Sequence, residues 1–229
     1  MAQGETRRPP GLVIFDCDGV LVDSEPTSNR VLAAAISAAG VPIDAAGVAE
    51  RFESMRLTDI RAAVELERGE PLPDGWIEEF ERRRAVEFAR GMDPIPGIGA
   101  LLARIRAARV PACVASQASV AKMEQTLGLT GLISYFEPAE LFSSRMVELG
   151  KPAPDLFFLA ARTMGVNPAR CVVIEDAAPG VYGALAAGMS ALGYAPSVDG
   201  TRPTEARLAA AGAATFESMA ELPALLGLV

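Results

Sequence analysis

Three short apolar runs of this sequence each end in side chains that could do chemistry. Asp16 and Asp18 follow the first run, Ser116 ends the second, and Glu175 and Asp176 end the third. Neighbouring carboxylates at a buried strand end repel each other, and a bound cation relieves that repulsion. A hard divalent ion such as Mg²⁺ prefers oxygen ligands of this kind. The pattern therefore indicates acid–base, nucleophilic or metal-assisted chemistry that depends on carboxylates.

The segment 11–25, GLVIFDCDGVLVDSE, contains the first pair of aspartates. Asp16 and Asp18 are two residues apart, so on an extended chain both side chains leave the same side. Cys17 lies between them and must face the other way, and we expect it to pack in the core. Gly19 then allows the backbone to turn away from the strand. We expect the two carboxylates to point into a shared site.

The lysines of this chain are few and therefore informative. Only Lys122 and Lys151 are present among 21 basic residues. Lys151 lies in the segment 150–155, GKPAPD, which reads as a loop before a helix. We expect Lys151 to be the one cation that reaches the carboxylates. A solvent-exposed loop lysine is the alternative when the residue is considered alone.

Alternating strands and helices are predicted to position these groups. The expected strands cover 12–15, 110–115, 171–174, 190–194 and 214–216, with a weaker strand or loop over 135–142. The expected helices cover 98–108, 120–127, 155–164, 181–187, 205–211 and 219–226. This alternation predicts an α/β fold, a Rossmann-like doubly wound parallel sheet. In such a sheet the carboxyl ends of the strands share one edge, where ligands bind.

A helical insert is predicted directly after the first strand. Helical patterns cover 27–39, 44–52, 57–68 and 74–90, and no strand-like run appears between 26 and 92. The breaker cluster DPIPG at 93–97 ends this region. We therefore predict a core made of 1–25 and 94–229, and an all-helical insert over 26–93.

Composition excludes several classes of function. The chain of 229 residues has no histidine, which removes histidine bases, triads and metal sites. Its formal net charge of −8 argues against nucleic-acid and membrane partners. Three cysteines in apolar runs suit reduced, buried thiols, and no stretch has the length of a signal peptide or a bilayer span. We expect a cytoplasmic protein, and the absence of a heptad or large apolar stripe favours a monomer.

The four chemical segments, in this order, resemble the motifs of the haloacid dehalogenase superfamily of aspartate-nucleophile phosphohydrolases. The first segment, DCDGVL, matches the pattern DxDG followed by hydrophobic residues, and Ser116, Lys151 and the Glu175–Asp176 pair match the other three motifs. The resemblance covers essentially the whole chain. It also implies that the insert is a helical cap of the C1 type, which closes over the substrate and sets specificity.

The resemblance implies a catalytic role for four residues. Asp16 would be the nucleophile that forms an aspartyl-phosphate, and Asp18 would be the general acid and then the base. Ser116 would hold phosphate oxygens, and Lys151 would neutralise charge on the transferring group. Taken alone, Ser116 could instead cap a turn or helix.

The resemblance also implies a metal site and substrate contacts. Mg²⁺ would be held by Asp16, the backbone carbonyl of Asp18 and Asp176, with Glu175 supporting through water. Substrate would contact Ser116 and Lys151. We also expect contacts from Arg56 in the insert and from Gln117, a departure from the family pattern, since relatives usually carry a small residue or Asn at that position. Two structural alternatives stay open. Glu175 and Asp176 could cap the next helix, and Arg56 could be a solvent-exposed helix residue without a substrate contact.

These inferences lead to a predicted function. We expect a Mg²⁺-dependent phosphatase for a small phosphorylated metabolite, with sugar or polyol phosphates favoured by the resemblance. The alternative is a β-phosphoglucomutase-like phosphomutase, which shares the core. That enzyme pattern uses a histidine after the first motif and a cap lysine, and neither is present here. A binding module that kept the fold is a third reading, disfavoured by the intact carboxylate set.

Overall fold

One parallel sheet lies at the centre of the molecule. The computed structural model describes residues 8–52, 55–197 and 204–228, and in these the sheet has the order β3-β2-β1-β4-β5-β6. The strands are β1 (Leu12–Phe15), β2 (Ala112–Ser116), β3 (Leu141–Ser143), β4 (Cys171–Glu175), β5 (Ser190–Tyr194) and β6 (Ala214–Phe216). The order reverses at β1, as expected for a doubly wound sheet.

The middle strand β1 is fully buried, which explains its continuous apolar sequence. Phe15 at its end pairs with Val114 of β2 on one side and with Ile174 of β4 on the other. All neighbouring strands pair in parallel. The register therefore brings the carboxyl ends of β1, β2 and β4 to one edge of the sheet.

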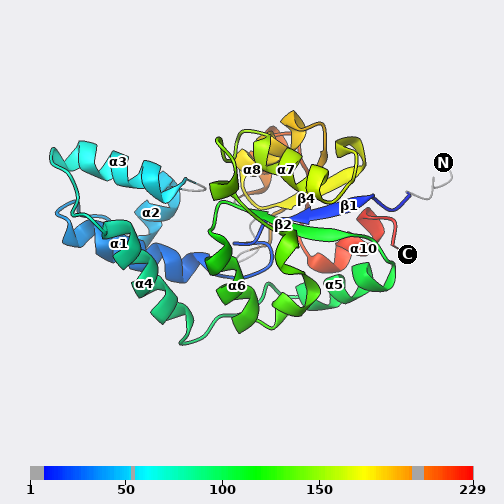
Figure 1. The fold of residues 1–229 in the computed structure, drawn as a ribbon, viewed down its shortest axis with the longest axis horizontal. Helices are drawn as coiled ribbons and strands as arrows, with labels where there is room; N and C mark the ends of the chain where they lie inside the picture. Colours follow the sequence, from blue (N-terminus) through cyan, green and yellow to red (C-terminus); the bar gives the residue numbers. More distant parts are fainter. Residues whose placement is uncertain (1–7, 53–54, 198–203, 229) are drawn as a thin grey trace.

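Helices cover both faces of the sheet (Figure 1). One face carries α5 (Ile98–Ala107), α6 (Val120–Leu129) and α10 (Leu222–Leu225), and the other carries α7 (Asp155–Thr163), α8 (Ala178–Ala186) and α9 (Glu205–Ala210). Each face has its own buried apolar cluster, the first including Leu101 and Met123 and the second including Phe157 and Val181. The predicted Rossmann-like α/β fold is confirmed.

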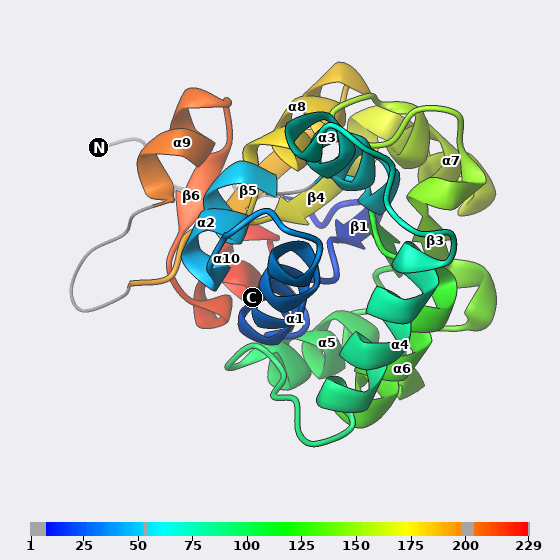
Figure 2. The ribbon, with the colours of Figure 1, turned by 90° about the vertical axis from the view of Figure 1, so that its left-hand side faces the viewer.

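Four helices between β1 and α5 form a separate lobe, which Figures 1 and 2 show beside the sheet. They are α1 (Glu25–Ala38), α2 (Ala45–Phe52), α3 (Leu57–Arg68) and α4 (Trp76–Phe88). The lobe has its own apolar cluster, which includes Ile36, Val64 and Phe80. The described part of the predicted insert thus contains helices and no paired strand, while its exact boundaries at 26 and 93 stay a prediction.

Several helices and strands begin or end at residues other than those predicted from the sequence. The region expected as a weak strand or loop holds short 3₁₀ helices and β3, and the last predicted helix is a 3₁₀ turn followed by α10. Helix α8 begins at Ala178, three residues before the predicted start, because proline at 179 is tolerated in a first turn. The 3₁₀ helices are Leu132–Tyr135, Pro138–Glu140, Ser144–Met146, Pro168–Arg170 and Met219–Glu221.

The two chain crossings between the sheet and the helical lobe lie side by side. The Asp23 N–H donates to the carbonyl of Asp93 at 3.0 Å, and the Ile95 N–H donates to the carbonyl of Leu21 at 3.0 Å. Val22 and Pro94 also form an isolated antiparallel bridge. The lobe is therefore joined to the sheet through one narrow paired connection.

The three cysteines are free and buried, as the sequence predicts. The Cys17 sulfur lies 3.8 Å from the Thr126 hydroxyl and so points into the core. Among the helices that the structure describes, none combines the length and the apolar character needed to cross a bilayer.

Candidate active site

The chain leaves β1 through a tight loop that carries the two aspartates. The Asp16 N–H still donates to the Ile174 carbonyl at 3.0 Å, so the first aspartate sits on the strand end. Gly19 has φ +76°, and a Cβ there would lie 1.9 Å from an Asp176 carboxylate oxygen. Glycine at this position therefore serves two purposes, because it permits the turn and makes room for the second carboxylate pair.

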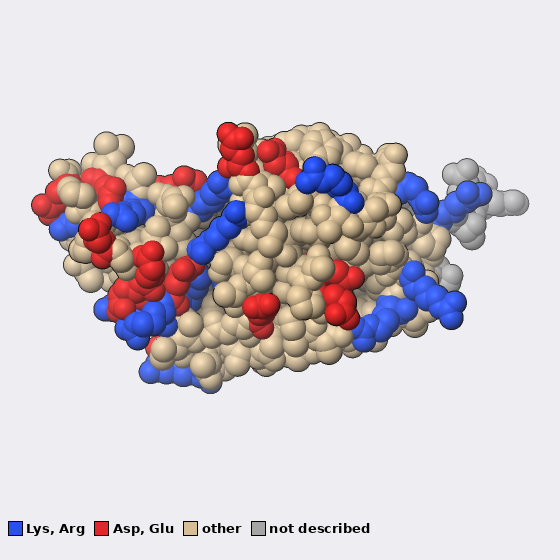
Figure 3. All heavy atoms as spheres, in the orientation of Figure 1, with Lys and Arg blue, Asp and Glu red and all other residues tan. Residues whose placement is uncertain are grey.

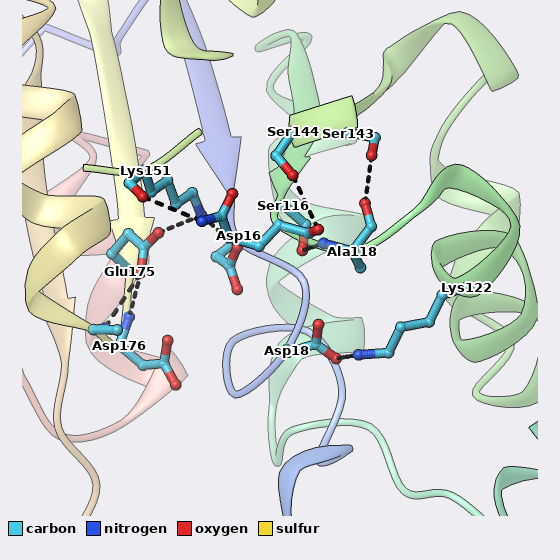
Figure 4. A network of polar contacts seen from close by, with 12 residues as sticks. Asp16, Asp18, Ser116, Ala118, Lys122, Ser143, Ser144, Lys151, Glu175 and Asp176 are labelled. Atoms are coloured by element: carbon cyan, nitrogen blue, oxygen red, sulfur yellow. Dashed lines mark hydrogen bonds and ion pairs between the residues drawn. The ribbon is translucent and has the colours of Figure 1, made fainter. Parts of the chain in front are cut away.

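A buried ion cluster occupies the sheet edge (Figure 4). The Lys151 Nζ donates to Asp16 Oδ1 at 2.5 Å and to Glu175 Oε1 at 2.5 Å. The exposed fractions are 7 % for Lys151, 8 % for Asp16 and 1 % for Glu175. Gly180 in α8 leaves space for Glu175, since a Cβ there would lie 1.8 Å from its carboxylate. The structure thus brings three of the predicted residues into direct contact.

Burial dominates the electrostatics of this cluster. It raises the pKa of Asp16 to about 7, because burial and the carboxylates of Glu175 and Asp18 outweigh the Lys151 ammonium. Burial, followed by the charges of Glu25 and Glu175, also raises the pKa of Asp176 well above its usual range. Burial lowers the pKa of Lys151, but its two paired carboxylates outweigh burial and raise it. Lys151 therefore stays charged.

The carboxylates of Asp16, Glu175 and Asp176 form a candidate metal site. One oxygen from each of these residues lies within 4.8 Å of the others. No hydrogen bond or ion pair within the described ranges reaches the Asp176 carboxylate, which faces this cluster. Such an all-oxygen donor set fits Mg²⁺. The Asp18 carboxylate lies outside this group, and the contribution of its backbone carbonyl stays a prediction.

Asp18 lies on the other side of the loop and has its own cation. The Lys122 Nζ donates to Asp18 Oδ1 at 2.7 Å, and the Ser24 hydroxyl donates to the same oxygen. Burial raises the pKa of Asp18, but the Lys122 charge and these two hydrogen bonds outweigh burial and lower it. Asp18 is therefore held as a carboxylate in this geometry.

The expectation that Lys151 alone would reach this edge is wrong, because Lys122 reaches it too. Helix α6 begins directly after β2, and its N-cap Ser119 accepts a hydrogen bond from the Lys122 N–H at 3.3 Å. The first turn of α6 therefore aims Lys122 across the sheet edge toward Asp18. The one feature of the sequence that could have pointed to Lys122 is the scarcity of lysine in an arginine-rich chain.

Serine side chains fix the loop that follows β2. Ser116 is 1 % exposed, and its hydroxyl accepts from the Ala118 N–H at 3.1 Å. The Ser143 hydroxyl donates to the Ala118 carbonyl at 2.6 Å, and the Ser144 hydroxyl donates to the Gln117 carbonyl at 3.1 Å. The two serines after β3 were not singled out from the sequence, because their role depends on the pairing of β3 with β2.

The two remaining predicted residues lie at the entrance to the cluster. The Gln117 side-chain amide donates to the Lys151 carbonyl at 3.2 Å. Arg56, from the helical lobe, donates to the carbonyls of Ser144 at 3.2 Å and Glu148 at 3.1 Å. Arg56 therefore bridges the lobe and the sheet domain, and its substrate contact stays a prediction.

A cavity of about 570 Å³ lies between the sheet edge and the helical lobe. Its lining combines Asp16, Asp18 and Lys151 with residues of α1, α3 and α4. Figure 3 shows Lys and Arg side chains along this boundary, next to acidic groups on the lobe. This volume suits a small molecule rather than a polymer.

Comparison with known proteins identifies the family. The model of the haloacid dehalogenase-like hydrolases matches residues 10–188. The chain is 33% identical to 6-phosphogluconate phosphatase of Escherichia coli (strain K12), covering 93% of both chains. It is 31% identical to fructose-1-phosphate phosphatase of the same strain, covering 79% of this chain and 94% of that one.

A solved structure extends the likeness to three dimensions. The crystal structure of a conserved haloacid dehalogenase-like protein from Agrobacterium tumefaciens str. C58 has 36% sequence identity and a TM-score of 0.77. The match covers 94% of this chain and 97% of that chain. Together with the family model and the geometry of the sheet edge, this shows that the chain belongs to the haloacid dehalogenase-like hydrolases.

Proposed function

We propose that this hydrolase is a Mg²⁺-dependent phosphatase that acts on a small phosphorylated metabolite, with sugar and polyol phosphates favoured. The observation that carries the proposal is the cluster of buried Asp16, Lys151 and Glu175 with half-buried Asp176, which lines a small cavity. The names of relatives support the substrate class, since they include phosphatases of 6-phosphogluconate, fructose 1-phosphate and hexitol phosphates.

Asp16 is the proposed nucleophile. Its carboxylate oxygen attacks phosphorus, the bond between phosphorus and the leaving oxygen breaks, and an aspartyl-phosphate forms. The contact between Lys151 and Asp16 supports this role, because it orients the carboxylate and sets a positive charge beside the transferring group. Ser116 and nearby backbone N–H groups would hold phosphate oxygens.

Asp18 is the proposed general acid and base. It would give a proton to the leaving oxygen and then, as a carboxylate, take a proton from the water that attacks phosphorus. This second step releases inorganic phosphate and restores Asp16. The hydrogen bonds from Lys122 and Ser24 to Asp18 favour the carboxylate form that the second step requires.

Asp16, Asp176 and the backbone carbonyl of Asp18 are the proposed ligands of Mg²⁺, with Glu175 in support. When bound, the ion would screen the negative charges that the nucleophile and the phosphate bring together. The raised pKa values of Asp16 and Asp176 fit this assignment, because crowded buried carboxylates without a cation retain protons.

The helical lobe is the proposed cap. It forms one wall of the cavity, and its closure would exclude bulk water from the reaction. Gln117 and Arg56, which both line the cavity and lie next to Gly150, are proposed substrate contacts. In this arrangement the sheet edge performs the chemistry, while the lobe selects the substrate.

The test is release of inorganic phosphate from a panel of sugar, polyol and aldonate phosphates, followed by ³¹P NMR on the preferred substrate. We expect phosphate to appear in step with substrate loss. An isomeric sugar phosphate, especially one that requires added bisphosphate, would identify a phosphomutase instead. Absence of phosphate release from every compound in the presence of Mg²⁺ would contradict the proposal.

A further inference from the structure

Arg84 is a buried cation whose partners within the protein are poor. It lies on α4, is 8 % exposed and lines the cavity. Its guanidinium stands over the rings of Phe80 at 4.8 Å and Phe88 at 5.9 Å. Glu81 is 3.8 Å away, and its carboxylate is held more closely by Arg145 at 2.6 Å. Across the described ranges, no hydrogen bond leaves Arg84.

This arrangement differs from that of a structural arginine. A guanidinium carries five N–H donors, and a buried cation is stable when those donors meet acceptors. Even the exposed arginines of α4 have acceptors, since Arg82 and Arg83 both donate to Glu79. Arg84 has no hydrogen-bonded acceptor among the described residues, and it lines the cavity, where an anion from outside the protein can meet its donors.

Lys122 lies near the same place. Its ammonium is 5.8 Å from the centre of the Phe88 ring, the ring over which Arg84 also stands. Lys122 donates to Asp18, and both cations line the same cavity as that aspartate. A lysine ammonium has three donors, so the bond to Asp18 leaves capacity for a second acceptor. The two cations thus face a common part of the cavity.

We infer that Arg84 and Lys122 form a subsite for a second anionic group of the substrate, a carboxylate or a second phosphate. This inference rests on the proposed phosphatase function. Figure 4 shows Lys151 and Lys122 on opposite sides of the two aspartates. A phosphate at Asp16 and Lys151 leaves the rest of the molecule to extend past Asp18 toward α4.

Charge explains why such a subsite affects selectivity. The protein carries a net charge of −8, so an anionic substrate gains from local cations at both of its ends. Guanidinium binds carboxylate and phosphate through two parallel hydrogen bonds, which a neutral hydroxyl cannot match. Phosphates with a second anionic group should therefore be preferred over equally long neutral ones.

The experiment compares three substrates of one chain length: a hexonate 6-phosphate, a hexitol 6-phosphate and a hexose bisphosphate. Wild type should show a kcat/KM at least about 10-fold higher for one or both doubly anionic compounds than for the hexitol phosphate. The compound with the larger advantage shows whether the subsite prefers a carboxylate or a phosphate. The variants are Arg84→Gln, Arg84→Lys and, as a matched control on the exposed face of α4, Arg83→Gln.

Arg84→Gln should remove most of that advantage by raising KM for the doubly anionic substrates, while kcat/KM for the hexitol phosphate changes by less than about 3-fold. Arg84→Lys should restore part of it, and Arg83→Gln should keep all of it. Phosphatase activity without any preference in wild type would overturn the subsite and leave the proposed function standing. Equal losses on all three substrates in Arg84→Gln would also overturn it, by indicating a structural role for the arginine.

Discussion

The sheet edge and the helical lobe hold their charged groups in opposite ways. At the edge, Lys151 is buried and contacts the buried carboxylates of Asp16 and Glu175, each at 2.5 Å. On the lobe, most ion pairs lie on the surface, as in Arg82 with Glu79, whose side chains are 65% and 41% exposed. Exposed pairs of this kind contribute little to stability. The edge thus groups its charges in a buried cluster, whereas Arg84 is the one buried charged residue in the described part of the lobe.

The two regions also differ in how they are anchored. The strands that end at the edge are paired on both sides and buried, so their terminal side chains are fixed by the sheet. The lobe meets the sheet domain through the paired crossing and a few polar contacts, among them Arg145 with Glu81 and Gln125 with the Ala85 carbonyl. This contrast predicts a fixed catalytic edge and a lobe that can adjust to its ligand.

Removal of the nucleophile should have the largest effect. Asp16→Asn should lower kcat by at least about 10³-fold, because a carboxamide is a far poorer nucleophile at phosphorus. Turnover of a generic aryl phosphate measures the loss, and circular dichroism checks the fold. The matched control is Asp23→Asn, an exposed carboxylate of the same segment. Near wild-type activity in Asp16→Asn would remove Asp16 from this role.

The contrast between the regions also explains what could be predicted from sequence. The strand ends were readable because a parallel sheet converts distant positions into neighbours at one edge. Asp16, Glu175 and Lys151 therefore met as expected. Secondary structure in the lobe was predicted as well, because its apolar residues recur at helical spacing.

The predictions missed residues whose roles depend on tertiary geometry. Lys122 reaches Asp18 only because α6 starts immediately after β2, and nothing local to its sequence marks that direction. Arg84 is one of three consecutive arginines at 82–84, and nothing in the sequence distinguishes it from its two exposed neighbours. Its burial follows from the packing of α4 against α6, which periodicity alone does not reveal.

Chelation tests the metal site at the edge. Treatment with EDTA should reduce phosphatase activity by at least about 10²-fold, and Mg²⁺ should restore it, because crowded carboxylates need a cation before phosphate can approach. Zn²⁺ should be a poor substitute, since the candidate ligands are all oxygens. A fluorescence or circular dichroism control shows that the apoprotein stays folded. Full activity after exhaustive chelation would contradict the assignment.

Stabilisation of the fold by Mg²⁺ should depend on pH, and we expect this effect to be smaller than the loss of activity on chelation. The pKa of Asp16 rises from 3.8 to about 7 in the folded protein, so the native state binds more protons than the unfolded state in that window. The free energy of unfolding of the metal-free protein therefore falls as pH rises from about 4 to 7. Asp18 has a lowered pKa, so its contribution changes only at lower pH.

Mg²⁺ competes with those protons, so the rise in Tm on adding saturating Mg²⁺ should be larger at pH 8 than at pH 5.5 by a few degrees. Differential scanning calorimetry in matched buffers measures it. Asp16→Asn should flatten the pH dependence, while Asp23→Asn should retain it. A rise in Tm that is the same at both pH values in the wild type would show that Asp16 does not exchange protons for metal.

The smallest effect we expect is a shift of the lobe relative to the sheet. We expect hinges near Glu25–Pro26 and Asp93–Pro96, next to the paired crossing, since the cavity lies between two bodies that have separate apolar clusters. Paired spin labels on exposed positions of α3 and α7 should report a shorter distance when Mg²⁺ and a phosphate-mimicking fluoride complex are added. Arg145→Gln, which removes the contact with Glu81, should broaden the distance distribution of the free protein and leave that of the complex unchanged. As a control, labels on α5 and α9, which both lie on the sheet domain, should report no change in any state. If the distance between α3 and α7 also stays constant, the lobe is as fixed as the edge.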